Sequence, residues 1–160
     1  METYTACYKS PLGNIEIVGT HESIVELNFV EDAAFTDSEL PFCVKACLKQ
    51  IDEYFRGRRQ EFLLNLSPMG TAFQKSVWQE LKKIPYGNVA FYQDIANAIG
   101  KPNACRAVGA ANGKNPISII IPCHRIIGSD GGLTGYGGGL WRKEWLLKHE
   151  REYHTNNIIA

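Results

Sequence analysis

The 160-residue sequence contains no apolar run long enough to cross a bilayer. Its first residues, METYTACYKS, lack a charged start followed by an apolar segment, so no secretory signal is expected. The five cysteines are odd in number and none forms a Cys-x-x-Cys pair, which argues against a zinc finger. We therefore expect free thiols, no metal, no membrane partner, and a reducing compartment: the cytoplasm, or the nucleus of a eukaryote.

The chain also lacks net charge, but its charges are unevenly distributed. Residues 1–67 carry 6 Lys and Arg against 11 Asp and Glu, a balance of −5, and residues 68–160 carry 11 against 6, a balance of +5. This division predicts two modules, of which the second faces an anionic partner. Unevenly charged solvated faces would give the same counts.

The N-terminal residues alternate between apolar and polar side chains in stretches separated by turn signals. This pattern predicts a three-stranded antiparallel sheet, followed by a helix and one more strand. The expected strands are Tyr4–Lys9, Asn14–Thr20, Ile24–Val30 and Glu61–Leu66, and the expected helix is Glu39–Phe55. Residues 1–67 are thus predicted to form an α/β module.

After a joint at Ser67-Pro68-Met69-Gly70, helical spacing dominates and predicts a mostly α-helical domain over residues 68–160. Thr71 and Gln74 fit a capping box at the start of a helix that runs to about Lys83. A final amphipathic helix is expected over Leu140–Arg151.

Two short helices are predicted between them, Tyr92–Ile99 and Asn103–Asn112, with Asn103 as the N-cap of the second. The Gly100 turn between them makes a helix-turn-helix pattern. Small side chains surround the second helix almost completely, and Arg106 is its only charge. Such a surface permits close approach either to a partner backbone or to a neighbouring helix.

The segment SIIIPCHRIIG places reactive side chains inside an apolar run. Pro116–Ile121 is predicted to be a buried strand that ends at Pro122 and leaves Cys123 at the strand end. A thiol becomes a good nucleophile only as a thiolate, and the neighbouring His124 and Arg125 favour that form.

A carboxylate is needed to orient the histidine, and Glu150 shares the inward face of Leu146 and Leu147. Adjacent residues of an extended chain point to opposite sides, so Cys123 and His124 are expected either to leave strand geometry or to communicate through a water molecule. A core cysteine beside a satisfied histidine is the structural alternative.

Three segments of the sequence carry a family resemblance: IPCHRII, GGLTGYGGGLWRKEWLLKHE and YGNVAFYQDIANAIGKPNACRAVGAANGKNP. They resemble the O6-alkylguanine-DNA alkyltransferases over about Thr71 to Glu150. Residues 1–67 fit in outline, as the ribonuclease-H-like N-terminal module of that family. The resemblance implies a monomer without a cofactor that binds double-stranded DNA through the minor groove. It further implies a single-turnover transfer of the alkyl group from O6-alkylguanine, and from O4-alkylthymine, to the protein.

The resemblance also assigns roles to the residues that match the family motifs. It implies that Cys123 is the alkyl acceptor, His124 the base acting through water, Glu150 the carboxylate behind it, and Asn115 a brace of the active site. Arg125 completes the motif with a structural role.

Three further matches are implied to contact the DNA. Tyr136 would hydrogen-bond the flipped base and help it leave, and Tyr92 would crowd the 3′ phosphate. Arg106 would replace the extruded base in the stack.

Two other functions compete with alkyl transfer. One is a non-enzymatic sensor that clamps alkylated bases without reacting. The other is a thiol hydrolase using Cys123, His124 and Glu150, which would need an oxyanion hole and repeated turnovers.

Overall fold

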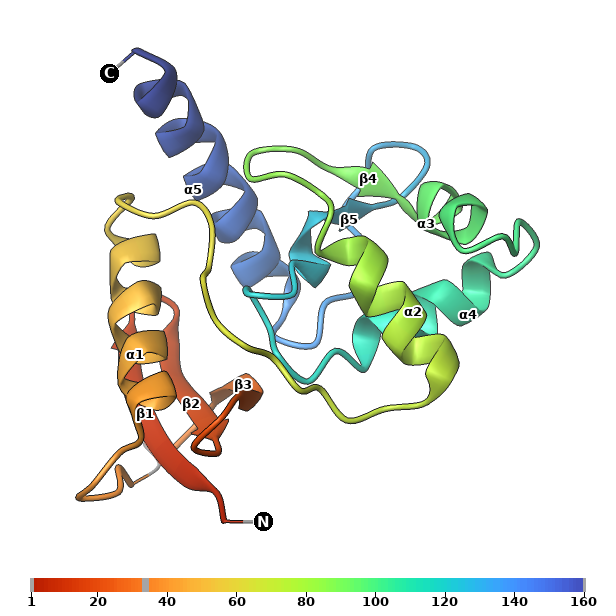
Figure 1. Cartoon of the computed structure of the whole chain (residues 1–160). Helices are drawn as coiled ribbons and strands as arrows, with labels where there is room; N and C mark the ends of the chain where they lie inside the picture. The colour runs from red at the N-terminus through yellow and green to blue at the C-terminus, as the bar shows by residue number, and fades with distance from the viewer. Residues whose placement is uncertain (1, 33–34, 160) are drawn as a thin grey trace. The chain divides into compact units, whose positions relative to one another are not determined.

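The computed structural model describes residues 2–32 and 35–159, and side chains as far as His154. Contacts between Cα atoms divide the chain into two compact units, Met1–Met69 and Gly70–Ala160, whose elements are labelled in Figure 1. The predicted fold class is confirmed, because an antiparallel sheet with a helix precedes a mostly helical unit. Within the described residues, no helix is both long and apolar enough to cross a membrane.

The first unit is a sheet with strand order β1-β2-β3, joined by antiparallel pairing, and a helix packed on its strands. Its elements are β1 (Tyr4–Ser10), β2 (Gly13–Gly19), β3 (Ile24–Val30) and α1 (Phe42–Phe55). Ile15, Leu27 and Ile51 are completely buried where the sheet meets the helix. The helix begins later than its predicted start at Glu39, because Pro41 keeps an extended backbone at the N-cap.

The strand predicted at Glu61–Leu66 is wrong apart from one isolated bridge between Ile24 and Leu66. The physical reason lies in Gln50 of α1, whose side chain pairs with the backbone of Leu63. Gln50 Nε2 donates to Leu63 O over 3.2 Å, and Leu63 N donates to Gln50 Oε1 over 2.9 Å. A helix side chain thus occupies backbone groups that a strand would use in a ladder.

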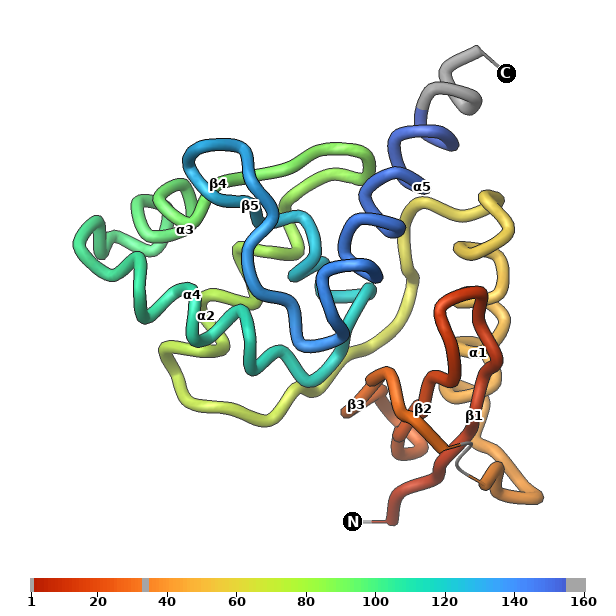
Figure 2. Tube along the Cα trace, turned by 180° about the vertical axis from the view of Figure 1, so that it is seen from behind, coloured from red at the N-terminus to blue at the C-terminus, as the bar shows by residue number. Residues whose placement is uncertain are grey.

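The second unit is mostly helical and contains a two-stranded parallel ladder, β4–β5, whose strands lie side by side in Figures 1 and 2. Its elements are α2 (Ala72–Leu81), β4 (Ala90–Phe91), α3 (Tyr92–Ala98), α4 (Cys105–Gly113), the 3₁₀ helix η1 (Cys123–Arg125), β5 (Ile126–Ile127) and α5 (Leu140–Ile159). Both α2 and α3 pack on α4, while α5 packs on η1. Buried Trp78 joins α2 to α4 by donating its indole N–H to Ala111 O over 2.8 Å.

One of the two predicted helix caps is confirmed. Gln74 N donates to Thr71 Oγ1 over 3.1 Å, and Thr71 N donates to Gln74 Oε1 over 2.9 Å, which completes the capping box. The N-cap role predicted for Asn103 is wrong, because α4 begins one residue after Ala104 and has no side-chain cap. Ala104 N donates to Lys101 O over 2.9 Å, so Asn103 lies inside the turn before the helix.

The strand predicted at Pro116–Ile121 is also wrong, although its isoleucines are buried as expected. The segment is a compact turn in which Ile121 N donates to Ile117 O over 3.0 Å. Ile119 has a φ of 71°, a left-handed conformation that is unfavourable for a β-branched residue. The surrounding contacts must therefore hold this turn in place.

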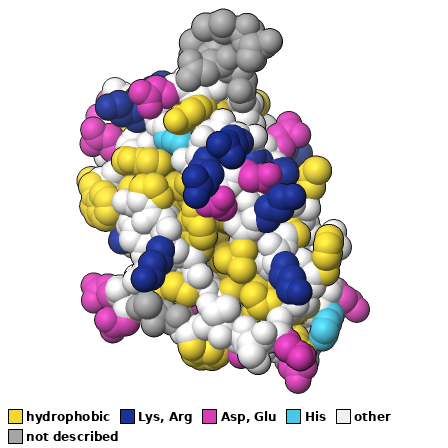
Figure 3. All heavy atoms as spheres, turned by 90° about the vertical axis from the view of Figure 1, so that its left-hand side faces the viewer, with side chains coloured by type: hydrophobic (Ala, Val, Ile, Leu, Met, Phe, Trp, Pro, Cys, Tyr) yellow, Lys and Arg dark blue, Asp and Glu magenta, His cyan; other side chains and the backbone are white. Residues whose placement is uncertain are grey.

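Charged side chains of both signs lie side by side on the face drawn in Figure 3. In the first unit, Arg56 pairs with Asp52 and Arg59 with Glu53, each over 2.9 Å. The basic residues Arg56 and Arg59 therefore lie beside carboxylates within a unit that is acidic overall.

Candidate active site

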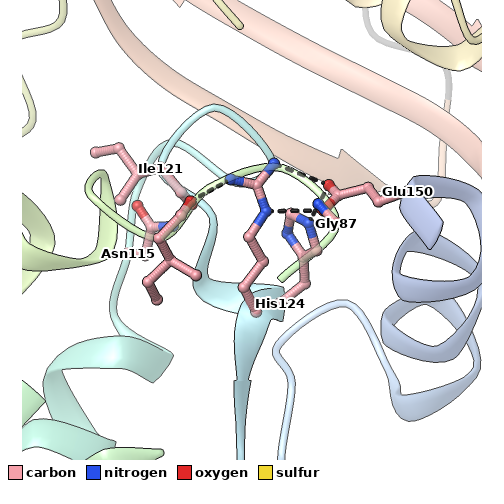
Figure 4. Close-up of polar contacts among 7 residues, drawn as sticks. Gly87, Asn115, Ile121, His124 and Glu150 are labelled. Atoms are coloured by element: carbon pink, nitrogen blue, oxygen red, sulfur yellow. Dashed lines mark hydrogen bonds and ion pairs between the residues drawn. The ribbon is translucent and has the colours of Figure 1, made fainter. Parts of the chain in front are cut away.

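The side chain of Asn115 stabilises the turn that precedes Cys123. Its Nδ2 donates to Ile121 O over 2.7 Å, and its Oδ1 accepts from Ile117 N over 3.0 Å. Figure 4 labels Asn115 and Ile121. Cys123 is 5% exposed and opens η1, and Asn112 Nδ2 of α4 donates to its carbonyl over 3.3 Å. Side-chain amides thus replace the ladder bonds that a strand would have supplied.

Glu150 of α5 is the centre of a buried polar cluster. Figure 4 shows its side chain pointing from the helix toward His124. Its Oε2 lies 2.6 Å from His124 Nε2, and Arg125 donates to both carboxylate oxygens, over 2.8 and 3.0 Å. Gly87 N adds a longer bond of 3.4 Å to Oε1. The third donor of Arg125, Nη1, reaches Ile84 O over 2.7 Å. The guanidinium therefore fixes the carboxylate that faces the histidine.

This cluster sets the protonation of its members. Burial lowers the pKa of His124 despite the nearby carboxylate, so the ring is neutral near pH 7. Burial alone would raise the pKa of Glu150, but His124 and Arg125 outweigh it and hold that pKa well below its usual range. The neutral ring then donates Nε2–H to Glu150 and leaves a lone pair on Nδ1, which is buried without a hydrogen-bond partner among the described residues.

Cys123 is a thiol at rest, because burial raises its pKa. A hydrogen bond from Asn115 and the positive charge of Lys143 oppose this rise. Lys143 is fully buried on α5, and its Nζ donates to Thr134 O over 3.0 Å. Burial lowers the pKa of Lys143, and a thiolate at Cys123 would oppose this by raising it.

Sequence reasoning missed Lys143 and the pairing of Arg125 with Glu150. A signal for the lysine was present in its spacing, because it precedes Leu146 by three residues and Glu150 by seven. These intervals place all three on one face of a helix.

The three residues predicted to contact DNA lie on different segments of the second unit: the loop before α5, α3 and α4. Burial raises the pKa of Tyr136 well above its usual value, so this phenol stays protonated. Its hydroxyl oxygen is buried. Tyr92 is half-buried at the start of α3, and its hydroxyl lies 2.6 Å from Thr134 Oγ1. Arg106 is exposed on α4.

Comparison with known protein families gives matches along nearly the whole chain. The DNA-binding domain of 6-O-methylguanine DNA methyltransferase matches residues 72–152, and the ribonuclease-like domain of the same family matches residues 3–68. The chain belongs to the 6-O-methylguanine DNA methyltransferase family. The resemblance predicted from the sequence motifs is thereby confirmed.

Individual family members are similar over most of their length. The methylated-DNA–protein-cysteine methyltransferase of Methanosarcina acetivorans is 46% identical, covering 92% of this chain and 97% of that protein. The crystal structure of the Mycobacterium tuberculosis O6-methylguanine methyltransferase has a TM-score of 0.85 at 42% identity, covering 95% of this chain and 94% of that one. Mycobacterium tuberculosis OGT in complex with DNA has a TM-score of 0.84 at 43% identity, covering 92% of both chains.

Proposed function

We propose that this chain repairs alkylated DNA directly, by moving an alkyl group from O6 of guanine, or O4 of thymine, onto its own Cys123. The observation that carries the proposal is the buried Cys123 beside the His124–Glu150 pair, in a chain of this family. Relatives of nearly the same length are named as methyltransferases whose acceptor is a protein cysteine.

His124 acts as the base in this proposal. Its Nδ1 lone pair has no partner among the described residues, and it accepts the Cys123 proton through one water molecule. Glu150 holds the ring in the required tautomer by accepting from Nε2–H, and Arg125 keeps Glu150 ionised. The pair thereby offsets the cost of forming a thiolate in a buried place.

The transfer itself is a displacement at carbon. A bond forms between Cys123 Sγ and the alkyl carbon as the bond from that carbon to guanine O6 breaks. The leaving guanine takes a proton from the Tyr136 hydroxyl, which burial keeps protonated. Tyr136 regains the proton that His124 took from the thiol, so the thiol proton is passed to guanine overall. The thioether is stable, so each molecule reacts once and no cofactor takes part.

The damaged base must leave the duplex before it reaches a buried thiol, and extrusion costs roughly a few kcal/mol. Exposed Arg106 on α4 fills the gap in the stack, and Tyr92 crowds the neighbouring phosphate. The small side chains of α4 suit entry into the narrow minor groove. The balance of +5 in residues 68–160 attracts the DNA backbone to a monomeric protein.

The intact mass of the protein, measured after incubation with duplex DNA carrying O6-methylguanine, tests the proposal. We expect a gain of one CH₂ unit, located on the peptide that contains Cys123, with a yield that stops at one group per chain. An unchanged mass in a folded, DNA-binding protein would contradict alkyl transfer and support a sensor. Sustained ester hydrolysis would support a thiol hydrolase instead.

The proposed location is the cytoplasm, or the nucleus if the host is a eukaryote. A reducing compartment is required, because oxidation of Cys123 would remove the nucleophile.

A further inference from the structure

The glycine-rich loop between β5 and α5 contains two small turns of its own. In the first, Gly128 N donates to Gly132 O and Gly131 N donates to Gly128 O, each over 2.9 Å. In the second, Gly139 N donates to Tyr136 O over 2.8 Å, next to the start of α5. Between these turns lies Thr134, which forms hydrogen bonds to two elements outside the loop.

The side chain of Thr134 contacts the start of the helix-turn-helix. Its Oγ1 lies 2.6 Å from the Tyr92 hydroxyl. The Tyr92 ring passes over α4 at Gly109, where an added Cβ would lie 3.7 Å from Tyr92 Cε1. Tyr92 is therefore positioned at both ends, by Gly109 beneath the ring and by Thr134 at the hydroxyl.

The backbone of Thr134 contacts the other side of the site. Its carbonyl accepts a 3.0 Å hydrogen bond from Nζ of buried Lys143, whose charge acts on Cys123. Two residues further along the loop, Tyr136 has a buried hydroxyl, and its pKa responds to the charge of Cys123. Thr134 thus lies between the side chain proposed to act on DNA and those beside the thiol.

We propose that Thr134 is a positioning residue for the reaction of duplex DNA. Its hydroxyl holds Tyr92 in the orientation needed to extrude the base, and its carbonyl keeps the loop that carries Tyr136 against α5. This inference rests on the proposed alkyl transfer. The preorganised tyrosine saves the cost of ordering that side chain when DNA binds.

Two substitutions distinguish the effect of the Thr134 hydroxyl from that of its methyl group, which lies near Gly128. Thr134→Val keeps the methyl and removes the hydroxyl, whereas Thr134→Ser keeps the hydroxyl and removes the methyl. Ser129→Ala, at an exposed position of the same loop, is the matched control for loss of a hydroxyl. Thermal melting of each variant checks that the fold is retained.

Single-turnover rates of Cys123 methylation are measured with two substrates, duplex DNA containing O6-methylguanine and the free base O6-methylguanine. For Thr134→Val we expect a loss of about three- to tenfold with the duplex, the effect of one hydrogen bond, and almost none with the free base. Thr134→Ser and Ser129→Ala should match the unmodified chain with both substrates. In a Tyr92→Phe background, Thr134→Val should cause no further loss with the duplex, because the bond is already broken.

Unchanged duplex rates in Thr134→Val would overturn the inference, as would equal losses with both substrates or a further loss in the Tyr92→Phe background. Failure of the unmodified chain to react with either substrate would contradict the proposed alkyl transfer itself, which is a different outcome.

Discussion

Glu150 is a single carboxylate that serves both a histidine and an arginine, and its removal tests how much the buried cluster stabilises the fold. Glu150→Gln leaves the charge of Arg125, a residue that is 6% exposed, without its ionic partner. We expect the free energy of unfolding at pH 7 to fall by about 3 kcal/mol. Urea denaturation measures it, with exposed Glu152→Gln as the control.

The same substitution predicts a pH dependence. The folded protein holds the pKa of Glu150 below its ordinary value of 4.5, so the charged group stabilises the fold fully above that pH. This stabilisation is lost as the pH falls from 4.5 toward the folded-state value. The difference in unfolding free energy between the unmodified chain and Glu150→Gln should therefore shrink on acidification. A difference that stays constant from pH 7 to pH 3 would contradict the assignment.

Lys143 is the second residue whose charge can be tested directly. Its positive charge lowers the pKa of Cys123 against the larger effect of burial, so Lys143→Met should raise that pKa further. The rate at which iodoacetamide modifies Cys123, followed by peptide mass across pH, should then shift its midpoint to higher pH. Exposed Lys148→Met on the same helix should leave the profile in place. A purely structural role for Lys143 predicts no such shift.

At the scale of secondary structure, the two helix starts of the second unit make a matched comparison. Thr71→Ala breaks an observed capping box and should lower the free energy of unfolding by about 1 kcal/mol. Asn103→Ala should change it very little, because Asn103 does not cap α4. Chemical denaturation of the two variants checks this, and equal losses would place a cap at Asn103 after all.

The helix α4 gives a functional prediction at this scale. Arg106 is exposed, so Arg106→Ala should leave the fold intact and reduce extrusion of the damaged base more than binding to undamaged duplex. Titration of DNA binding and single-turnover transfer separate the two effects. Equal losses in both would assign Arg106 to phosphate attraction alone.

Strands β1, β2 and β3 and the Thr71 cap were predictable because their signals are local: apolar and polar residues alternate along each strand, and the capping box is a four-residue motif. The turn before Cys123 was not, because the Asn115 amide pairs with backbone groups at Ile117 and Ile121 and so stabilises a left-handed Ile119. The spacing of apolar residues indicates which side chains are buried. It does not reveal which polar side chain will hydrogen-bond the backbone groups that a neighbouring strand would otherwise pair with. The pairing of Glu150 with His124 could be proposed from helix spacing, whereas that with Arg125 depends on contacts between distant segments.

At the scale of the whole molecule, attraction to DNA and the proposed alkyl transfer depend on different features of the chain. Attraction to DNA depends on the basic residues between positions 68 and 160, and it weakens with salt. The proposed chemistry depends on the thiol of Cys123, which is 5% exposed. The proposed reaction would therefore add atoms to a buried part of the second unit.

This packing predicts that the alkylated protein is less stable. A methyl group on Cys123 must fit beside the Asn115 turn and the Asn112 side chain of α4, and overpacking of that kind costs about 1–3 kcal/mol. For a chain of this length the melting temperature should fall by roughly 2–4 °C per kcal/mol. Differential scanning calorimetry before and after complete reaction with methylated duplex, with the DNA removed, measures the change. Cys123→Ser treated with the same DNA should melt at an unchanged temperature, and an unshifted transition in the fully methylated protein would show that the site has room for the group.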